Sequence, residues 1–143
     1  MDLGIKHLNY LDDLKLNIND YVIGASASMV AHRLLNINDD IDFLIKPEVL
    51  AKLVFEKKMF MIVKNLPLGF IISYTDKSKN LDAHDSLTLT PDIPNNYWYK
   101  ESIIINNHRY MSIPQLKLFY TRLYNTFKLP KHKIRLDILN KVK

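Results

Sequence analysis

Two aspartates, Asp40 and Asp42, stand one residue apart in the otherwise apolar segment "DIDFLI". Alternate residues of a β-strand point to the same face, so these carboxylates are expected to project side by side, while Ile41 and Phe43 face the other way. Carboxylates held this close repel each other, and burying them unpaired is costly. One interpretation is a solvated strand end neutralised by lysine or arginine. The other is a divalent cation such as Mg²⁺, which binds carboxylates and phosphate oxygens.

The segment just upstream has the pattern of an anion-binding turn. "DYVIG" predicts a strand over 20–24, and "SASMVAHRLL" predicts a helix over 26–35. Backbone N–H groups at such a turn bind anions, Gly24 would let a phosphate approach the chain, and Ser26 would add a hydroxyl donor. The same sequence is also compatible with an ordinary strand-to-helix turn that binds no anion. A turn of this kind followed by a carboxylate pair is what phosphoryl transfer needs, because backbone donors hold phosphates while a metal neutralises their charge.

The arrangement "VIGASA…HRLLNINDDIDFLI" resembles the DNA polymerase β-like nucleotidyltransferase superfamily. That signature is a strand, Gly-Gly or Gly-Ser, a helix, and then Asp-x-Asp on a second strand. The chain is most similar to small bacterial-type members, the antibiotic nucleotidyltransferases and the minimal nucleotidyltransferases of toxin–antitoxin systems. The resemblance is strongest over 21–45. It implies that Gly24, Ala25 and Ser26 cradle phosphates and that Asp40 and Asp42 bind the metal. Ala25 departs from the usual second Gly or Ser.

The resemblance also implies a third carboxylate, on a later strand beside the first pair, that helps to bind the metal and can act as the base. Asp82 in "NLDAHD" has the expected pattern, because it lies between two apolar residues. Asp85 is the main alternative, and Asp76 is a more distant one. His84 shares a strand face with Asp82, although an ordinary surface or core histidine would look the same.

The C-terminal segment "SIPQLKLFYTRLYNTFKLPKHKIRLDILNKV" is similar to the helical C-terminal part of these families. Tyr120 falls about where many members place a lysine near the nucleotide, and the nearby cations are Lys117 and Arg122. The basic tail is expected either to form a solvated helix face or to bind an anionic partner. Trp98, with its tyrosine neighbours, would either stack on a base or belong to the core or a partner surface.

These residues need a scaffold, and the 143-residue chain with 48% apolar residues fits one domain with a real core. It has no cysteines, which excludes disulfides and thiolate metal sites. No apolar run reaches the roughly 20 residues of a membrane helix, so we expect a soluble, cytoplasmic protein with no membrane contact. The net charge of +5 favours an anionic partner, whether nucleotide or nucleic acid, or serves solubility alone.

The hydrophobic periodicity predicts an α+β domain over 1–143, with a core over about 1–110 and a helical part over about 111–143. The resemblance makes this a nucleotidyltransferase-like mixed sheet flanked by helices. Helices are expected over 2–15, 26–35, 47–59, 112–127 and 131–141. Strands are expected over 20–24, 40–45, 60–66, 69–75 and 80–90, with a hairpin over 102–111, a turn at 67–69 and a loop over 91–99.

The leading functional hypothesis is an Mg²⁺-dependent nucleotidyltransferase. It would move a nucleoside monophosphate from a nucleoside triphosphate, such as ATP, to a hydroxyl of RNA or tRNA, a protein or a small molecule. The alternative is a weak or inactive module of the same fold, either an antitoxin-like partner subunit or a nucleic-acid-binding protein that uses the basic tail. An oligomer or a partner chain is compatible with either.

Overall fold

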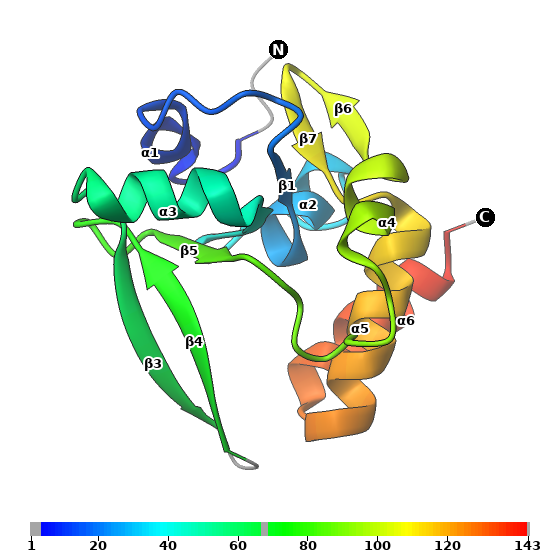
Figure 1. The fold of residues 1–143 in the computed structure, drawn as a ribbon. Helices are drawn as coiled ribbons and strands as arrows, with labels where there is room; N and C mark the ends of the chain where they lie inside the picture. The colour runs from blue at the N-terminus through cyan, green and yellow to red at the C-terminus, as the bar shows by residue number, and fades with distance from the viewer. Residues whose placement is uncertain (1–3, 67–68, 143) are drawn as a thin grey trace.

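A computed structural model describes residues 4–66 and 69–142. A seven-stranded mixed sheet in the order β3-β4-β5-β2-β1-β7-β6 runs through the molecule (Figure 1). Its strands are β1 (Tyr21–Ile23), β2 (Ile41–Ile45), β3 (Phe60–Leu66), β4 (Gly69–Thr75), β5 (Leu81–His84), β6 (Ile103–Ile105) and β7 (His108–Tyr110). The helices are α1 (Leu8–Asp12), α2 (Ala25–Ala31), α3 (Pro47–Phe55), α4 (Asn95–Lys100), α5 (Ile113–Phe127) and α6 (Pro130–Asn140). The expected α+β class is confirmed.

Two pairings decide where the central strands lie. β1 pairs antiparallel with β2, and β2 pairs parallel with β5 on its other side. β4 and β3 extend the sheet beyond β5 as a hairpin that projects away from the remaining strands (Figure 1). β2 and β5 therefore lie side by side at the middle of the sheet.

The prediction of a helix over 2–15 is wrong in its extent. Residues 1–3 lie outside the described residues, and α1 is a short helix. His7 and Lys15, on either side of it, have φ angles of +69° and +54°, which end the helical geometry. Before α1, the Lys6 backbone bonds to the side chain of buried Asn38 (N to Oδ1 2.8 Å, O to Nδ2 3.2 Å). This long-range pairing replaces helical hydrogen bonds.

The region from 80 to 100 also differs from expectation. β5 ends at His84, because β2 offers its last partner there, Leu44 opposite His84. The expected loop over 91–99 contains α4, which begins after Pro94. Pro94 is the N-cap of α4 and has an extended ψ of 140°, so its missing N–H costs the helix no hydrogen bond. Pro94 therefore precedes a helix in this structure and does not prevent one from forming. The turn expected at 67–69 falls partly on residues 67 and 68, outside the described chain.

Helices cover both faces of the sheet. One face packs against α1 and α3 in a core that includes Ile41, Phe43, Leu81 and Ala83. The other face, with Val22 and Leu44, packs against α4, α5 and α6 through a second core of buried side chains: Met29, Trp98, Met111, Leu116, Tyr120 and Leu139. Among the described residues, no helix is long and apolar enough to cross a bilayer.

A buried glutamine joins α4 to α5. Gln115 closes a capping box with Ser112, and its Nε2 donates to the carbonyl oxygens of Tyr97 (3.1 Å) and Trp98 (3.2 Å). The Gln115 amide thus gives the Trp98 carbonyl a partner at the end of α4 and adds a second donor to the Tyr97 carbonyl, which also accepts the Glu101 N–H. Trp98 is fully buried, so it belongs to the core and is not available to stack on a base.

Replacing Trp98 by Ala should lower the free energy of unfolding by about 3–5 kcal/mol, because a fully buried aromatic side chain is lost. The control, Ile104→Ala at a position 54% exposed, should change it by less than about 0.5 kcal/mol. Urea denaturation measures both. A loss at Trp98 no larger than that at Ile104 would contradict the burial.

Candidate functional site

The parallel pairing of β2 with β5 brings two aspartates together. Asp42 lies directly opposite Asp82 in the register of the two strands. The residues beside them, such as Ile41 and Ala83, point to the other face and are buried in the core against α1 and α3. A slip of one residue would bury the acids in that core, so the apolar–Asp–apolar alternation maintains the register.

His84 and Lys64 complete the cluster. His84 follows Asp82 on the same face of β5, and ligand atoms of Asp42, Asp82 and His84 all lie within 4.8 Å of one another. Lys64, from β3, forms an ion pair with Asp82 Oδ2. Asp40 lies just before β2 and borders the same cleft as the cluster.

Asp82 is only 6% exposed, and its Oδ1 is buried without a hydrogen bond. His84 Nε2 lies 3.5 Å from this oxygen, beyond the usual hydrogen-bond distance. A buried carboxylate oxygen of this kind is costly unless something positive approaches it. The donor set therefore fits a divalent cation, with carboxylate oxygens of Asp42 and Asp82 as ligands.

The pKa values of the three aspartates shift in different directions. Burial, followed by the negative charges of Asp40 and Asp82, raises the pKa of Asp42 well above its usual range. Burial and then the charge of Asp82 raise the pKa of Asp40. Burial would also raise the pKa of Asp82, but His84 and Lys64 outweigh it and hold that pKa below its usual range. Asp82 is therefore the aspartate that stays ionised most readily. Asp42 is the one whose negative charge is least favourable.

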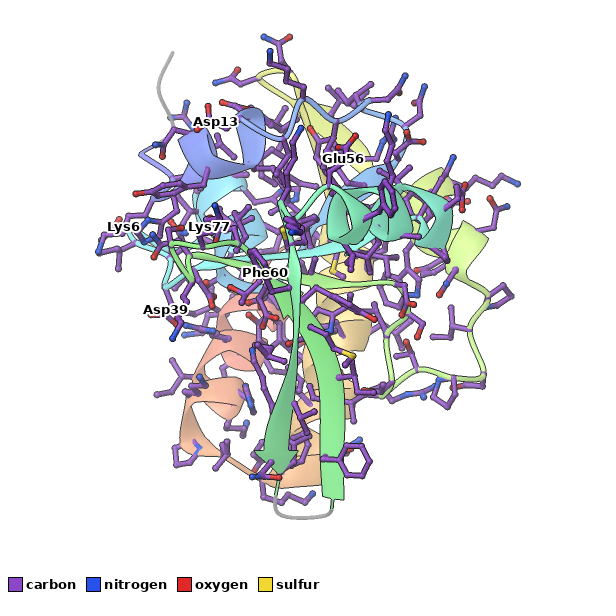
Figure 2. The ribbon with its side chains drawn as sticks, turned by 60° about the vertical axis from the view of Figure 1, so that its left-hand side comes forward. Lys6, Asp13, Asp39, Glu56, Phe60 and Lys77 are labelled. Carbon is purple, nitrogen blue, oxygen red and sulfur yellow. The ribbon has the colours of Figure 1, made fainter. Side chains whose placement is uncertain are left out.

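The cluster faces a cleft of about 510 Å³. One wall is the sheet with its acids, and a second is the β3–β4 hairpin, which contributes Lys64, Leu66 and Ile71. Figure 2 shows this hairpin in front of the C-terminal helices, which form the third wall. Those helices contribute apolar side chains and three residues of the basic tail: Phe119, Tyr120, Leu123, Phe127, Leu129, Lys131, His132 and Arg135.

Arg135 supplies the cation at the helical wall. Its guanidinium lies 3.6 Å from Asp39 Oδ2, donates to the Tyr120 hydroxyl at 3.4 Å, and stands 6.0 Å above the Tyr120 ring. Arg122, in contrast, forms a two-bond pair with Asp92 at 2.9 and 3.0 Å. Neither Arg122 nor Lys117 lines the cleft.

The turn at Gly24, Ala25 and Ser26 also borders the cleft, but the Gly24 N–H and the Ser26 hydroxyl already have partners. The Gly24 N–H donates to the Asp42 carbonyl at 2.8 Å. A Cβ on Gly24 would lie 2.8 Å from Met111 Cε, so the missing side chain makes room for Met111. The Ser26 hydroxyl accepts the Asp39 N–H at 3.3 Å. A phosphate role for this turn stays a prediction, and the Gly24 N–H does not contribute to it.

The two alternatives to Asp82 lie elsewhere. Asp85 is exposed beyond the end of β5. Asp76 accepts hydrogen bonds from the Ser78 hydroxyl and from backbone N–H groups of the turn before β5. Sequence reasoning missed Lys64 and Arg135 as site residues. Lys64 was visible as the single charge in the apolar strand "FMIVKNL", whereas Arg135 had no signal apart from the general basicity of the tail.

Comparisons of the chain with known protein families, curated proteins and solved structures found no match.

Asp42→Asn is expected to raise the melting temperature at pH 7 in EDTA, because the buried negative charge disappears. The folded-state pKa of Asp42 is raised, so the folded protein binds a proton more tightly than the unfolded chain, whose pKa is about 3.9. Stability is therefore lost as pH rises from about 4 toward the folded pKa. The gain from Asp42→Asn should shrink as pH falls to about 4.

Thermal melts at both pH values measure this difference, with Asp85→Asn, at an exposed carboxylate outside the cleft, as the control. A lower melting temperature for Asp42→Asn at pH 7 would show that the Asp42 charge stabilises the fold.

Proposed function

We propose that the protein is a metal-dependent nucleotidyltransferase, which moves a nucleoside monophosphate from a nucleoside triphosphate to an acceptor hydroxyl. The observation that carries this proposal is the pair Asp42 and Asp82, facing each other at a cleft that also contains Lys64 and Arg135. The Oδ1 of Asp82, which is buried without a hydrogen bond and has His84 Nε2 at 3.5 Å, supports a cation at this pair.

Asp40, Asp42 and Asp82 would hold the metal, which neutralises phosphate charge and orients the reacting groups. Mg²⁺ takes one or two carboxylates together with phosphate oxygens. The aspartates would supply the carboxylates, and a bound triphosphate would supply the phosphate oxygens. The cleft of about 510 Å³ lies between the cluster and the C-terminal helices, which leaves room for the triphosphate.

Lys64 and Arg135 approach the cleft from different walls, the hairpin and α6. Both would neutralise phosphate oxygens, Lys64 as a point charge and Arg135 through its planar guanidinium. The apolar side chains of α5 would contact the base or the acceptor. In this arrangement the triphosphate would lie between the carboxylates of the sheet and two cations, Lys64 on the hairpin and Arg135 on α6.

The reaction is an in-line displacement at the α-phosphorus. The acceptor oxygen forms a bond to phosphorus, the bond from phosphorus to the oxygen bridging the α- and β-phosphates breaks, and pyrophosphate leaves with that electron pair. In this proposal Asp82 would accept the hydroxyl proton through Oδ2, once Lys64 has left that oxygen and the acceptor lies within hydrogen-bond reach. The chain's contribution is mainly positioning and charge neutralisation.

The nucleic-acid-binding alternative predicts a basic surface that is free to contact a partner. In α6 the basic residues are divided between two environments. Lys133 pairs with Asp137 at 2.6 Å on the exposed side, whereas Lys131 and Arg135 line the cleft. This division favours a ligand in the cleft over a nucleic acid along the helix.

Asp42→Asn should lower the rate of nucleotidyl transfer by about 10²–10³-fold, because electrostatic stabilisation worth about 3–4 kcal/mol is lost from the transition state. The assay follows incorporation from each labelled nucleoside triphosphate into total RNA, total protein and small-molecule hydroxyls. Asp85→Asn is the matched control. Undiminished incorporation by Asp42→Asn would refute the catalytic assignment.

Arg135→Met should weaken binding of the nucleoside triphosphate by about 10–150-fold, which corresponds to the loss of a charge-assisted hydrogen bond of about 1.5–3 kcal/mol. Lys133→Met removes a charge from the exposed side of the same helix and should have little effect. Calorimetric titration with a non-hydrolysable analogue and Mg²⁺ compares the two. Equal losses for both variants would indicate a general effect of net charge instead of a contact in the cleft.

A further inference from the structure

We propose that His84 is a direct metal ligand and that the site therefore prefers a first-row transition-metal dication, with Mn²⁺ as the probe, over Mg²⁺. The inference deepens the proposed function by naming the metal at the same site. The ligand geometry on which it depends is nevertheless independent of any reaction.

The geometry places three donors of two kinds around one point. His84 and Asp82 are alternate residues of β5 and share its face, and Asp42 lies opposite Asp82 on β2. Ligands about 2.0–2.2 Å from a common metal lie at most about 4.4 Å apart. The three donor atoms are within 4.8 Å of one another, so small side-chain rotations would bring them to bonding distance.

The buried Oδ1 of Asp82, which has no hydrogen bond, is a second indication of a ligand. The residue is 94% buried (6% exposed), and Oδ1 has no hydrogen bond, although His84 Nε2 lies 3.5 Å away. Its other oxygen, Oδ2, is already paired with Lys64. Asp82 thus has one oxygen, Oδ1, to offer a cation. His84 adds a nitrogen ligand to the carboxylate oxygens of Asp42 and Asp82.

The identity of the donors favours one class of metal. Mg²⁺ requires oxygen ligands in a regular octahedron and keeps several waters, whereas imidazole nitrogen is a common ligand of transition metals. A set of two carboxylates and one imidazole suits ions that accept both nitrogen and oxygen. All three residues line the cleft, where water or phosphate oxygens have room to complete the coordination.

The test uses the full chain in metal-free buffer, titrated calorimetrically with Mn²⁺ or Mg²⁺. Wild type should bind Mn²⁺ more tightly than Mg²⁺. His84→Ala should lose Mn²⁺ affinity by at least the roughly 10–100-fold that removing a partner of a metal ligand costs, with a smaller change for Mg²⁺. The control is His108→Ala, because His108 pairs with Asp12 and does not line the cleft.

Electron spin-echo spectroscopy of the Mn²⁺ complex reads the ligand directly. Imidazole ¹⁴N modulation should be present in wild type and in His108→Ala but absent from His84→Ala. Because the wild-type spectrum alone reports the nitrogen ligand, the test stands even if His84→Ala folds poorly. Mn²⁺ binding without ¹⁴N modulation, or with unchanged affinity in a folded His84→Ala, overturns the inference.

These outcomes separate the two proposals. Nucleotidyl transfer without nitrogen coordination would leave the proposed function standing and remove His84 from the site. Nitrogen coordination without any transfer would establish the metal site and refute the proposed function. A wild-type protein that binds neither Mn²⁺ nor Mg²⁺, with or without a nucleoside triphosphate, would overturn both.

Discussion

The pairing of Asp42 with Asp82 across two neighbouring strands is the constraint on which the site depends. Their strands are held in register by apolar neighbours on the opposite face, so the carboxylates cannot separate without exposing that core. The resulting repulsion must be offset by positive charge. In this structure Lys64 does so for Asp82, and the pKa of Asp42 rises because burial and the neighbouring negative charges outweigh the same lysine.

This charge balance connects the β3–β4 hairpin to the rest of the sheet. β4 pairs with β5 at Tyr74 and Ala83, and Lys64 adds an ion pair from β3 to the same strand. The lysine is 39% exposed, so its side chain has room to leave Asp82 when a stronger cation or a phosphate arrives. The hairpin is consequently both a wall of the cleft and the source of the positive charge nearest to the acids.

The turn before α2 is restrained for a different reason. Ala25 has a φ of +52°, a left-handed conformation that costs a residue with a side chain roughly 1–2 kcal/mol. Gly24 leaves space for Met111, and the Ser26 hydroxyl receives the N–H of Asp39. These contacts join the turn to β7 and to the segment before β2. The strain at Ala25 is therefore compensated by packing on both sides of the turn.

Short-range patterns in the sequence determined the central strands, the α5 cap at Ser112, and the choice of Asp40 and Asp42 as candidates, because alternation and capping depend on neighbours along the chain. Asp82 became a candidate through the family resemblance. The structure alone decided what lies around them. Arg135 enters the cleft because α6 packs against α5, and Asn38 shortens the first helix by bonding to the Lys6 backbone. Such contacts join residues distant in sequence, and no local pattern encodes which partners tertiary packing will bring together.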